Sequence, residues 1–290
     1  MYTLERVMRN TFVRFSLWRF WPALALLGMP VAAQWVNYPI PGTPRTKTGQ
    51  PNLSAPAPKT PEGKPDFSGI WHAPNYSTRY LENLAADGVE VPFQPWSAAL
   101  YKERVENSGK DRPSGHCLPH SVTDYDAHHM PKKLIQTPGL LVMLFESYHS
   151  FRQIFMDGRP LPENRDPAWF GYSVGKWEGD TLVVQTTGFR DGIWLDAFGD
   201  PMTDAAKITE RFHRVNYGHL EIELTVDDSK AYTRPWTVKL YQVLVPDTEL
   251  LDYICAENEK DIPVRGLIGI QIHGGGKSEA SYRDITIEQL

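Results

Sequence analysis

The feature that most constrains the fold is a succession of short segments in which apolar and polar residues alternate. In the clearest segment, Leu220, Ile222, Leu224 and Val226 alternate with polar residues from His219 onward. A period of two is typical of an antiparallel strand that buries one face and exposes the other to water. Neighbouring segments are separated by Gly, Pro, Asn or Asp, which favour turns. The chain is therefore expected to be an all-β protein.

The expected strands cover most of the second half of the chain. They span Lys133–Gln136, Leu140–Glu146, Phe151–Met156, Tyr172–Trp177, Thr181–Thr187, Ile208–Val215, His219–Val226, Trp236–Val245 and Glu249–Cys255. After Trp236 the apolar residues change face near Leu240, which predicts a β-bulge there. Little helix is expected apart from Ser97–Glu106. Hairpin spacing predicts either an antiparallel, lipocalin-like barrel or a two-sheet sandwich.

The N-terminal segment has the composition of an export signal. Four Arg residues precede an uncharged run from Phe20 to Ala33 that ends in small residues, as in a secretory signal peptide. The run is short for a membrane span, although an uncleaved anchor is the alternative. We therefore expect a periplasmic or extracellular protein with no stable membrane insertion after cleavage of residues 1–33.

Composition divides the remaining chain into three parts. Residues 34–63 are rich in Pro, Thr, Gly and Ser, which predicts an extended leader. Residues 64–262 form the expected β body, with a long loop-rich insertion over 73–131. Residues 263–290 are expected to form a C-terminal β-hairpin joined to the body.

Charge and cysteine content restrict the partners and the compartment. The chain has 30 Lys and Arg against 35 Asp and Glu, with no basic cluster, which argues against nucleic acid or an anionic membrane as a partner. Its two cysteines, Cys117 and Cys255, both lie in the part expected to be exported. We expect one disulfide between them, with two buried free thiols as the alternative.

One strand carries a carboxylate on its apolar face. Glu210 shares a face with Ile208 and Phe212, so it is expected to point into the interior, where burial raises a carboxyl pKa and suits it to general acid or base catalysis. Arg152 is the expected counter-charge. The alternative is a structural ion pair or an outward-facing Glu210.

The loop from Gly115 to His129 concentrates polar side chains that can ligate metals. His116, His120, His128 and His129 lie there with two Asp and one Cys. Their spacing matches no established metal-binding pattern, so they are weak candidates and no metal or cofactor is expected. A solvated loop is the alternative.

Tryptophans near strand ends are candidate ligand-binding residues. Trp71, Trp169, Trp177 and Trp236 neighbour turn residues, where aromatic rings can stack on sugars or apolar ligands beside Arg152. The alternative is that they are core residues. Gly69-x-Trp71 resembles the opening of lipocalin-type barrels, in which the Trp plugs one end.

The C-terminal segment resembles a family with a known chemistry. Gly266 to Leu290 reads GLIGIQIHGGGKSEASYRDITIEQL, which is similar to the terminal hairpin of the 3-keto-disaccharide hydrolase domain, a secreted jelly roll. The body from Lys64 to Asp261 resembles a large group of secreted bacterial proteins without an assigned activity. Its matching motifs are GKPDFSGIW from Gly63, QTPG from Gln136, FRQIFMDGRP from Phe151, GYSVGKWEGDTLVV from Gly171 and AYTRPWT from Ala231.

The C-terminal resemblance implies a carbohydrate-related function. It implies hydrolysis or elimination at a glycoside oxidised at its 3-position, with Glu210 or His273 as the base. The alternative is a non-catalytic, lipocalin-like barrel that binds a small apolar or glycan ligand. Whether the protein is an enzyme, and its oligomeric state, are left open by the sequence.

Overall fold

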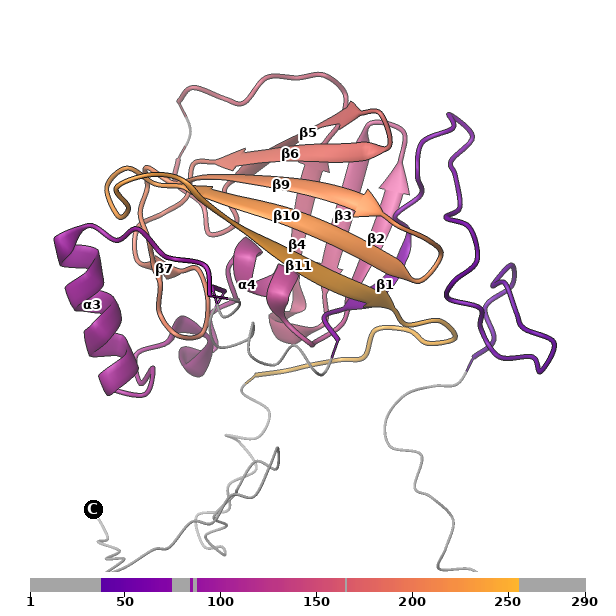
Figure 1. Ribbon diagram of the computed structural model, residues 1–290, viewed down its shortest axis with the longest axis horizontal. Coiled ribbons are helices and arrows are strands. Elements are labelled where there is room, and N and C mark those ends of the chain that lie inside the picture. Colours follow the sequence, from indigo (N-terminus) through magenta and orange to yellow (C-terminus); the bar gives the residue numbers. More distant parts are fainter. Residues whose placement is uncertain (1–37, 75–83, 86–87, 165, 256–290) are drawn as a thin grey trace, which may run out of the picture.

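Nine strands close into a barrel in the computed structural model, which describes residues 38–74, 84–85, 88–164 and 166–255 (Figure 1). Around the ring the strands are β1 (Gly69–His72), β11 (Trp236–Leu244), β10 (His219–Asp227), β9 (Lys207–Arg214), β6 (Thr181–Thr187), β5 (Tyr172–Glu178), β4 (Ser150–Phe155), β3 (Leu140–Phe145) and β2 (Lys132–Thr137). The all-β prediction and the barrel are confirmed. The sandwich alternative is wrong.

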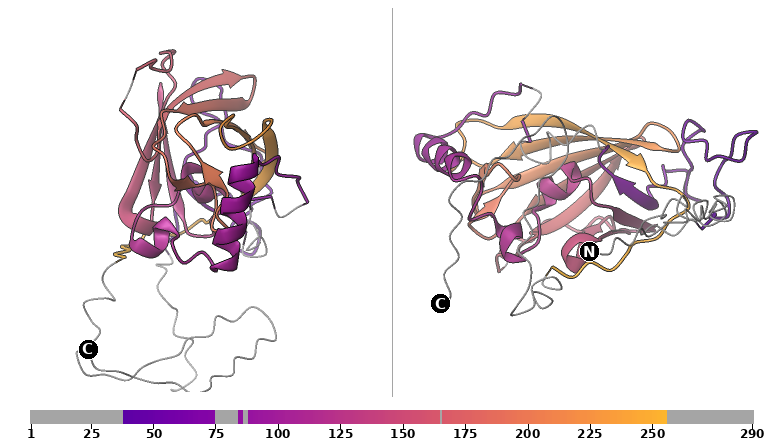
Figure 2. Two further views of the ribbon diagram at one scale, coloured as in Figure 1. Left: turned by 90° about the vertical axis from the view of Figure 1, so that its left-hand side faces the viewer. Right: turned by 90° about the horizontal axis from the view of Figure 1, so that it is seen from below.

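The helices lie mainly in the loop-rich insertion. They are α3 (Pro95–Glu106), η3 (Pro113–His116), α4 (Val122–Ala127) and η4 (Ser147–His149), and a separate two-stranded sheet pairs β7 (Ile193–Trp194) with β8 (Pro201–Met202). Figure 2 shows α3 outside one end of the barrel. The sequence analysis did not predict α4. It has only six residues, too few to show a helical period, although the Ser121 hydroxyl caps it by accepting a hydrogen bond from the Asp124 N–H at 3.1 Å.

Strand pairing is antiparallel everywhere in the ring except between β4 and β5. Those two strands are parallel and pair only at Ile154 with Ser173 and at Phe155 with Val174. By contrast, β10 pairs along its length with β9 and β11. Among the pairs in which both strands have six or more residues, β4 and β5 therefore share the shortest ladder.

Strand β11 runs without the expected bulge near Leu240. Its register with β10 is continuous from Trp236 to Val243, and buried and exposed residues alternate throughout. The apparent change of face arises because Gln242 occupies an inward-facing position, while Tyr241 faces outward. A buried polar residue was thus misinterpreted as a change of phase.

The strand expected over Glu249–Cys255 does not form. The barrel is already closed by pairing of β11 with β1, and within the described chain this segment pairs with no strand. It is held instead by single contacts: the Leu251 N–H donates to a Glu146 carboxylate oxygen at 2.9 Å, and the Tyr253 N–H donates to His149 Nε2 at 3.0 Å.

The described part of the leader lies against one end of the barrel. The N–H groups of Tyr217 and Gly218, in the β9–β10 turn, donate to the carbonyl oxygens of Ala55 and Leu53, each at 2.8 Å. Arg45 pairs with Asp247 at 2.8 Å. The described part of the leader therefore forms turns with isolated bridges between Arg45 and Pro51 and between Lys59 and Pro65, and specific contacts attach it to the body.

Two sequence-based expectations fall outside the described residues. These are the signal peptide at 1–33 and the C-terminal hairpin at 263–290. Within the part of the chain that the structure describes, no helix is both long and apolar enough to cross a membrane.

Candidate functional site

A buried ion pair links opposite sides of the barrel interior. Arg152 on β4 donates to both carboxylate oxygens of Glu210 on β9, at 2.7 and 2.5 Å. The two residues are 3% and 0% exposed. Arg152 also donates to the hydroxyls of Ser173 at 3.0 Å and Thr186 at 2.8 Å. Glu210 therefore points inward and Arg152 is its counter-charge, as the sequence predicted.

Three further polar groups extend this pair. Asp126 on α4 forms a buried ion pair with Lys132, and its carbonyl oxygen accepts a hydrogen bond from Gln242 Nε2 at 2.7 Å. The short helix α4 thus places a carboxylate inside the barrel. We refer to Asp126, Lys132, Arg152, Glu210 and Gln242 as the polar core.

Burial changes the acidity of the polar core. Desolvation raises the pKa of Glu210 to about 7; Arg152 opposes this rise and the neighbouring Asp126 adds to it. Desolvation also lowers the pKa of the Lys132 ammonium, against the attraction of Asp126. Within the described chain, Asp126 Oδ2 and Gln242 Oε1 have no hydrogen-bond partner. The polar core therefore holds a carboxyl group whose charge changes near neutral pH.

A hollow of about 380 Å³ opens where β4 and β5 separate. Because their ladder covers only the last two residues of β4, the described chain provides no strand partner on that side for residues 150–153. We call this space the β4–β5 hollow. Its lining residues are His149, Ser150, Phe151, Arg152, Gln153, Phe155, Ala168, Trp169, Phe170, Gly171, Tyr172 and Ser173.

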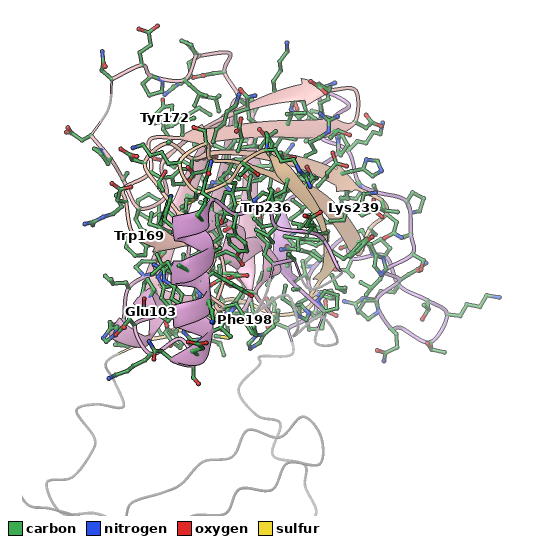
Figure 3. All side chains as sticks on the ribbon, turned by 60° about the vertical axis from the view of Figure 1, so that its left-hand side comes forward. Glu103, Trp169, Tyr172, Phe198, Trp236 and Lys239 are labelled. Atoms are coloured by element: carbon green, nitrogen blue, oxygen red, sulfur yellow. A yellow bond between two sulfur atoms is a disulfide. The ribbon has the colours of Figure 1, made fainter. Side chains whose placement is uncertain are left out.

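Aromatic rings make up much of this lining, and neighbouring groups hold several of them in place. Phe155 stacks on Tyr172 with 5.2 Å between ring centroids, and the Arg159 guanidinium lies 3.9 Å from the Phe155 ring centroid. The Trp169 indole N–H donates to the His120 carbonyl oxygen at 3.2 Å. Figure 3 shows Trp169 and Tyr172 on one side of the molecule and Lys239, on β11, on the other.

The β4–β5 hollow meets the polar core at Arg152, whose hydrogen-bond partner Ser173 also lines the hollow. The Nε, Nη1 and Nη2 groups of Arg152 all donate to protein oxygens. A ligand in the hollow would therefore contact a polar but already satisfied floor, with aromatic rings around it.

Three of the four predicted histidines, His120, His128 and His129, lie close together. His120 Nδ1 lies 2.5 Å from an Asp124 carboxylate oxygen, and the His120 ring lies 4.4 Å from the His128 ring, which stacks on His129. Burial and the proximity of His120 lower the pKa of His128 well below its ordinary value. Among the described residues, no group of three or more His, Cys, Asp or Glu side chains is arranged to hold a metal, and His116 lies apart in η3.

Two of the predicted ligand-binding tryptophans are buried and a third is half-buried. Trp71 is fully buried, donates its indole N–H to the Phe67 carbonyl at 2.9 Å and lies under the Arg214 guanidinium. Trp177 stacks on Phe67, with 5.5 Å between ring centroids. Trp236 is buried. Arg152 and Trp169 are the two predicted ligand-binding residues that line the β4–β5 hollow.

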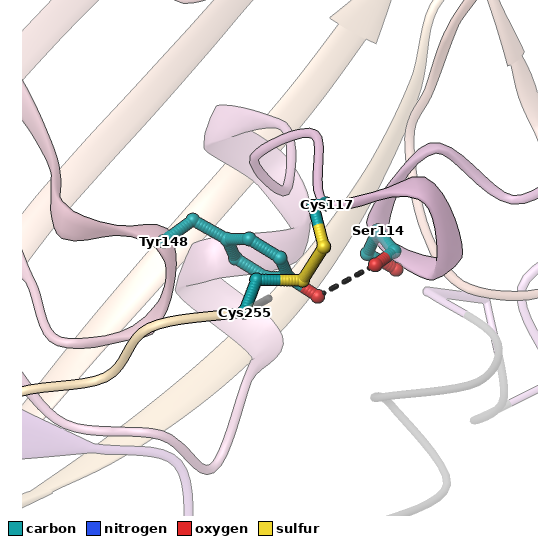
Figure 4. The surroundings of a disulfide bond; sticks show 4 residues. All are labelled: Ser114, Cys117, Tyr148 and Cys255. Atoms are coloured by element: carbon teal, nitrogen blue, oxygen red, sulfur yellow. Dashed lines mark hydrogen bonds between the residues drawn. A yellow bond between two sulfur atoms is a disulfide. The ribbon is translucent and has the colours of Figure 1, made fainter. Parts of the chain in front are cut away.

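The expected disulfide between Cys117 and Cys255 is confirmed. It joins the loop after η3 to the end of the described chain, beside the Tyr148 ring, whose hydroxyl donates to the Ser114 carbonyl oxygen at 2.8 Å (Figure 4). Tyr148 and His149 have positive φ angles of 61° and 44°, which few non-glycine residues adopt. The disulfide thus lies against a strained turn that leads into β4.

Several site residues were missed by the sequence analysis, and one predicted residue cannot be placed. Phe151, Phe155 and Tyr172 line the β4–β5 hollow. Their signal was available, because Phe151 and Phe155 put aromatic rings on the face of β4 opposite to Arg152. Asp126 lacked a signal, because α4 was not predicted. His273 lies outside the described residues.

Comparisons with known proteins leave the family open. No family model matches the chain, and no curated protein matches it. A crystal structure of a secretary abundant heat soluble (SAHS) protein from Ramazzottius varieornatus is similar over 62% of this chain and 95% of that one, at 10% identity and a TM-score of 0.29. A TM-score this low carries no structural argument. The barrel assignment depends on this chain's own strand pairing.

Proposed function

We propose that this protein is a non-catalytic barrel that binds a small ligand in the β4–β5 hollow. The observation that carries the proposal is the hollow itself, which combines a volume of about 380 Å³ with aromatic walls and a few polar groups. Small-molecule sites usually have this size and this combination of surfaces. Packed residues hold the walls, so the site exists before a ligand arrives.

The lining favours a ring-shaped ligand with one apolar face and a polar rim. The rings of Phe151, Phe155 and Tyr172 offer apolar contact to such a face. The Gln153 side chain and the unpaired edge of β4 offer hydrogen bonds to a rim. Both the C–H face of a pyranose and an aromatic ring meet these requirements, so the experiment must distinguish a glycan from an aromatic ligand.

Isothermal titration calorimetry with trehalose and with 2-naphthol tests this proposal. We expect one of the two probes to bind, and Phe151→Ser and Trp169→Leu to weaken its affinity at least tenfold. Phe151 is 61% exposed, so its replacement should not disturb folding. Tyr241→Ser, which removes an exposed ring from the outer face of β11, is the matched control and should bind as the wild type does. Absence of binding by both probes, or equal affinity in the Phe151→Ser variant, would contradict the proposal.

A second candidate function is cleavage of 3-keto-glycosides, as the C-terminal resemblance implies. The observation in its favour is Glu210, whose pKa of about 7 suits a general base near neutral pH. Removal of a C–H proton beside the keto group would begin bond cleavage. We rank this function second because Arg152 occupies both oxygens of Glu210. Sugar release from 3-keto-trehalose that is lost in Glu210→Gln would support it, and no release by the wild type would rule it out.

Either function is proposed for an exported protein. The disulfide is typical of an oxidising compartment, and the sequence of residues 1–33 is typical of a signal peptide. We therefore propose a periplasmic or extracellular location. Amino-terminal sequencing of the protein secreted by its host tests this, since cleavage near Ala33 is expected.

A further inference from the structure

The outer surface of strands β2, β3 and β4 is apolar, although it faces away from the barrel interior. The inward positions of these strands hold core residues such as Leu134, Met143 and Ile154. The alternate positions point outward, and we call the six apolar ones the apolar wall. They are Ile135, Leu140, Val142, Leu144, Phe151 and Phe155.

Strand register brings these residues together in cross-strand pairs, and Lys133, Thr137 and Gln153 occupy the remaining outward positions of the three strands. Ile135 is opposite Val142, Leu144 is opposite Phe151, and Leu140 is opposite Phe155. Phe151 is 61% exposed and Ile135 39% exposed. A contiguous exposed apolar surface on a folded protein usually marks a place where something else packs.

The last described residues lead the chain to the edge of this wall. Leu250 and Leu251 line a hollow of about 280 Å³ together with Leu144 and Phe151. The N–H groups of Leu251 and Tyr253 are anchored at Glu146 and His149, beside the ends of β3 and β4. The described chain therefore passes the edge of the wall shortly before it ends at Cys255.

The sequence of that remaining segment has the pattern that such a wall requires. Ile268, Ile270 and Ile272 alternate with Gly269, Gln271 and His273, and Ile285 and Ile287 alternate with Thr286 and Glu288. Two such strands would carry apolar residues on one face. A two-stranded hairpin alone is marginally stable in water and needs a surface on which to bury that face.

We propose that residues 263–290 fold back as a two-stranded ribbon and pack their isoleucine face on the apolar wall. The three strands of the wall are about 10 Å across, since neighbouring strands lie about 4.8 Å apart. The linker from Cys255 to Pro263 spans up to about 25–30 Å when extended, so the ribbon can reach across the wall. Phe151 and Phe155 belong both to this wall and to the lining of the β4–β5 hollow, so the test uses Val142, which does not line the hollow.

Limited trypsin digestion of the full chain tests the proposal at Arg265, Lys277 and Arg283, the cleavage sites within the ribbon. In the wild type we expect slow cleavage at all three sites. Val142→Glu places a charge in the centre of the wall and should accelerate cleavage at least tenfold. Thr209→Glu is the matched control, because Thr209 is a β-branched residue of similar exposure on the outer face of β9, and it should digest at the wild-type rate.

A milder variant keeps the test valid if Val142→Glu does not fold. Val142→Thr keeps the shape and removes the apolar contact, and it should accelerate cleavage severalfold. Rapid cleavage of the wild type, or equal rates in the wild type and both Val142 variants, would overturn the proposal. Protection that depends on protein concentration would also overturn it, because a second copy would then cover the wall.

Discussion

Strands β2–β3–β4 and β9–β10–β11 form two opposite walls of the barrel (Figure 2). The inner faces of the two walls are alike, and the residues on their outer faces differ. Both alternate buried and less buried residues along every strand. The outer face of β9–β11 is mostly polar, with Arg211 and Glu223 as neighbouring charges and Thr225 bonded to Thr237. The outer face of β2–β4 is the apolar wall. The inner alternation therefore specifies the barrel, and the outer faces are free to serve other purposes.

The largest expected effect comes from breaking the ion pair that joins the two walls. Arg152→Met leaves Glu210 buried without its counter-charge and should lower the free energy of unfolding by about 3–5 kcal/mol at pH 8. Arg211→Met, on the outer face, removes an exposed ion pair with Glu178 and should change the free energy of unfolding by less than about 1 kcal/mol. Urea denaturation of both variants measures the difference. Similar small losses would show that the interior pair does not hold the walls together.

The second effect is a pH dependence caused by Glu210. Its pKa rises from 4.5 in the unfolded chain to about 7 in the folded barrel, so the folded state binds a proton more tightly between these values. This contribution to stability is complete below pH 4.5 and is lost as the pH rises through 7. Relative to Glu210→Gln, the wild type should lose on the order of 3 kcal/mol over this window. Parallel stability curves for the two proteins between pH 4.5 and 7.5 would contradict the prediction.

A smaller effect is expected from the polar residue that β11 turns inward. Gln242→Leu removes the N–H donor to the Asp126 carbonyl and should cost about 1–3 kcal/mol, because a buried acceptor is left unpaired. Gln185→Leu, at a half-buried position on β6, is the control and should be nearly neutral. Thermal unfolding of the two variants compares them. If Gln242→Leu stabilises the protein, the inward position does not require a polar side chain.

The smallest effect concerns the outer faces themselves. In the full chain Val142→Thr should cost about 1 kcal/mol, because a covered apolar contact is lost, whereas Thr209→Val on the opposite wall should change stability by less than about 0.5 kcal/mol. In a chain ending at Asp261 the Val142→Thr cost should nearly vanish. Denaturant titration of these three variants and of the full and shortened parent chains tests this. If Val142→Thr costs as much in the shortened chain, the outer faces of the two walls do not differ in this way.

Much of the barrel could be predicted because its long strands bury one face each. The strand expected at Thr181–Thr187 is β6, and the one expected at His219–Val226 is β10 apart from one residue. The same phase argument placed Glu210 inside, and Arg152 was expected as its counter-charge. The phase argument failed at Gln242, since a polar side chain inside a barrel resembles an outward-facing residue in the sequence.

The β4–β5 hollow could not be predicted, because it arises from which strands become neighbours. Phe155 and Tyr172 come close only because the chain between them runs back along the barrel before β5 begins. Likewise the segment Glu249–Cys255 has the composition of a strand, but β11 is already paired with β1 and the segment forms no ladder. Periodicity reports which face of a strand is buried and does not report its partner.

One consequence of the barrel follows from the parity of its strands. When every neighbour in a ring runs in the opposite direction, the number of members must be even, and this ring has nine. At least one pair must therefore share a direction, and here it is β4 with β5. Substitutions can alter the gap at that joint, but they cannot remove the mismatch in orientation. Only the gain or loss of a whole strand could, so one parallel joint is a topological necessity of the ring, whereas the opening beside Arg152 arises because the ladder at this joint is only two residue pairs long.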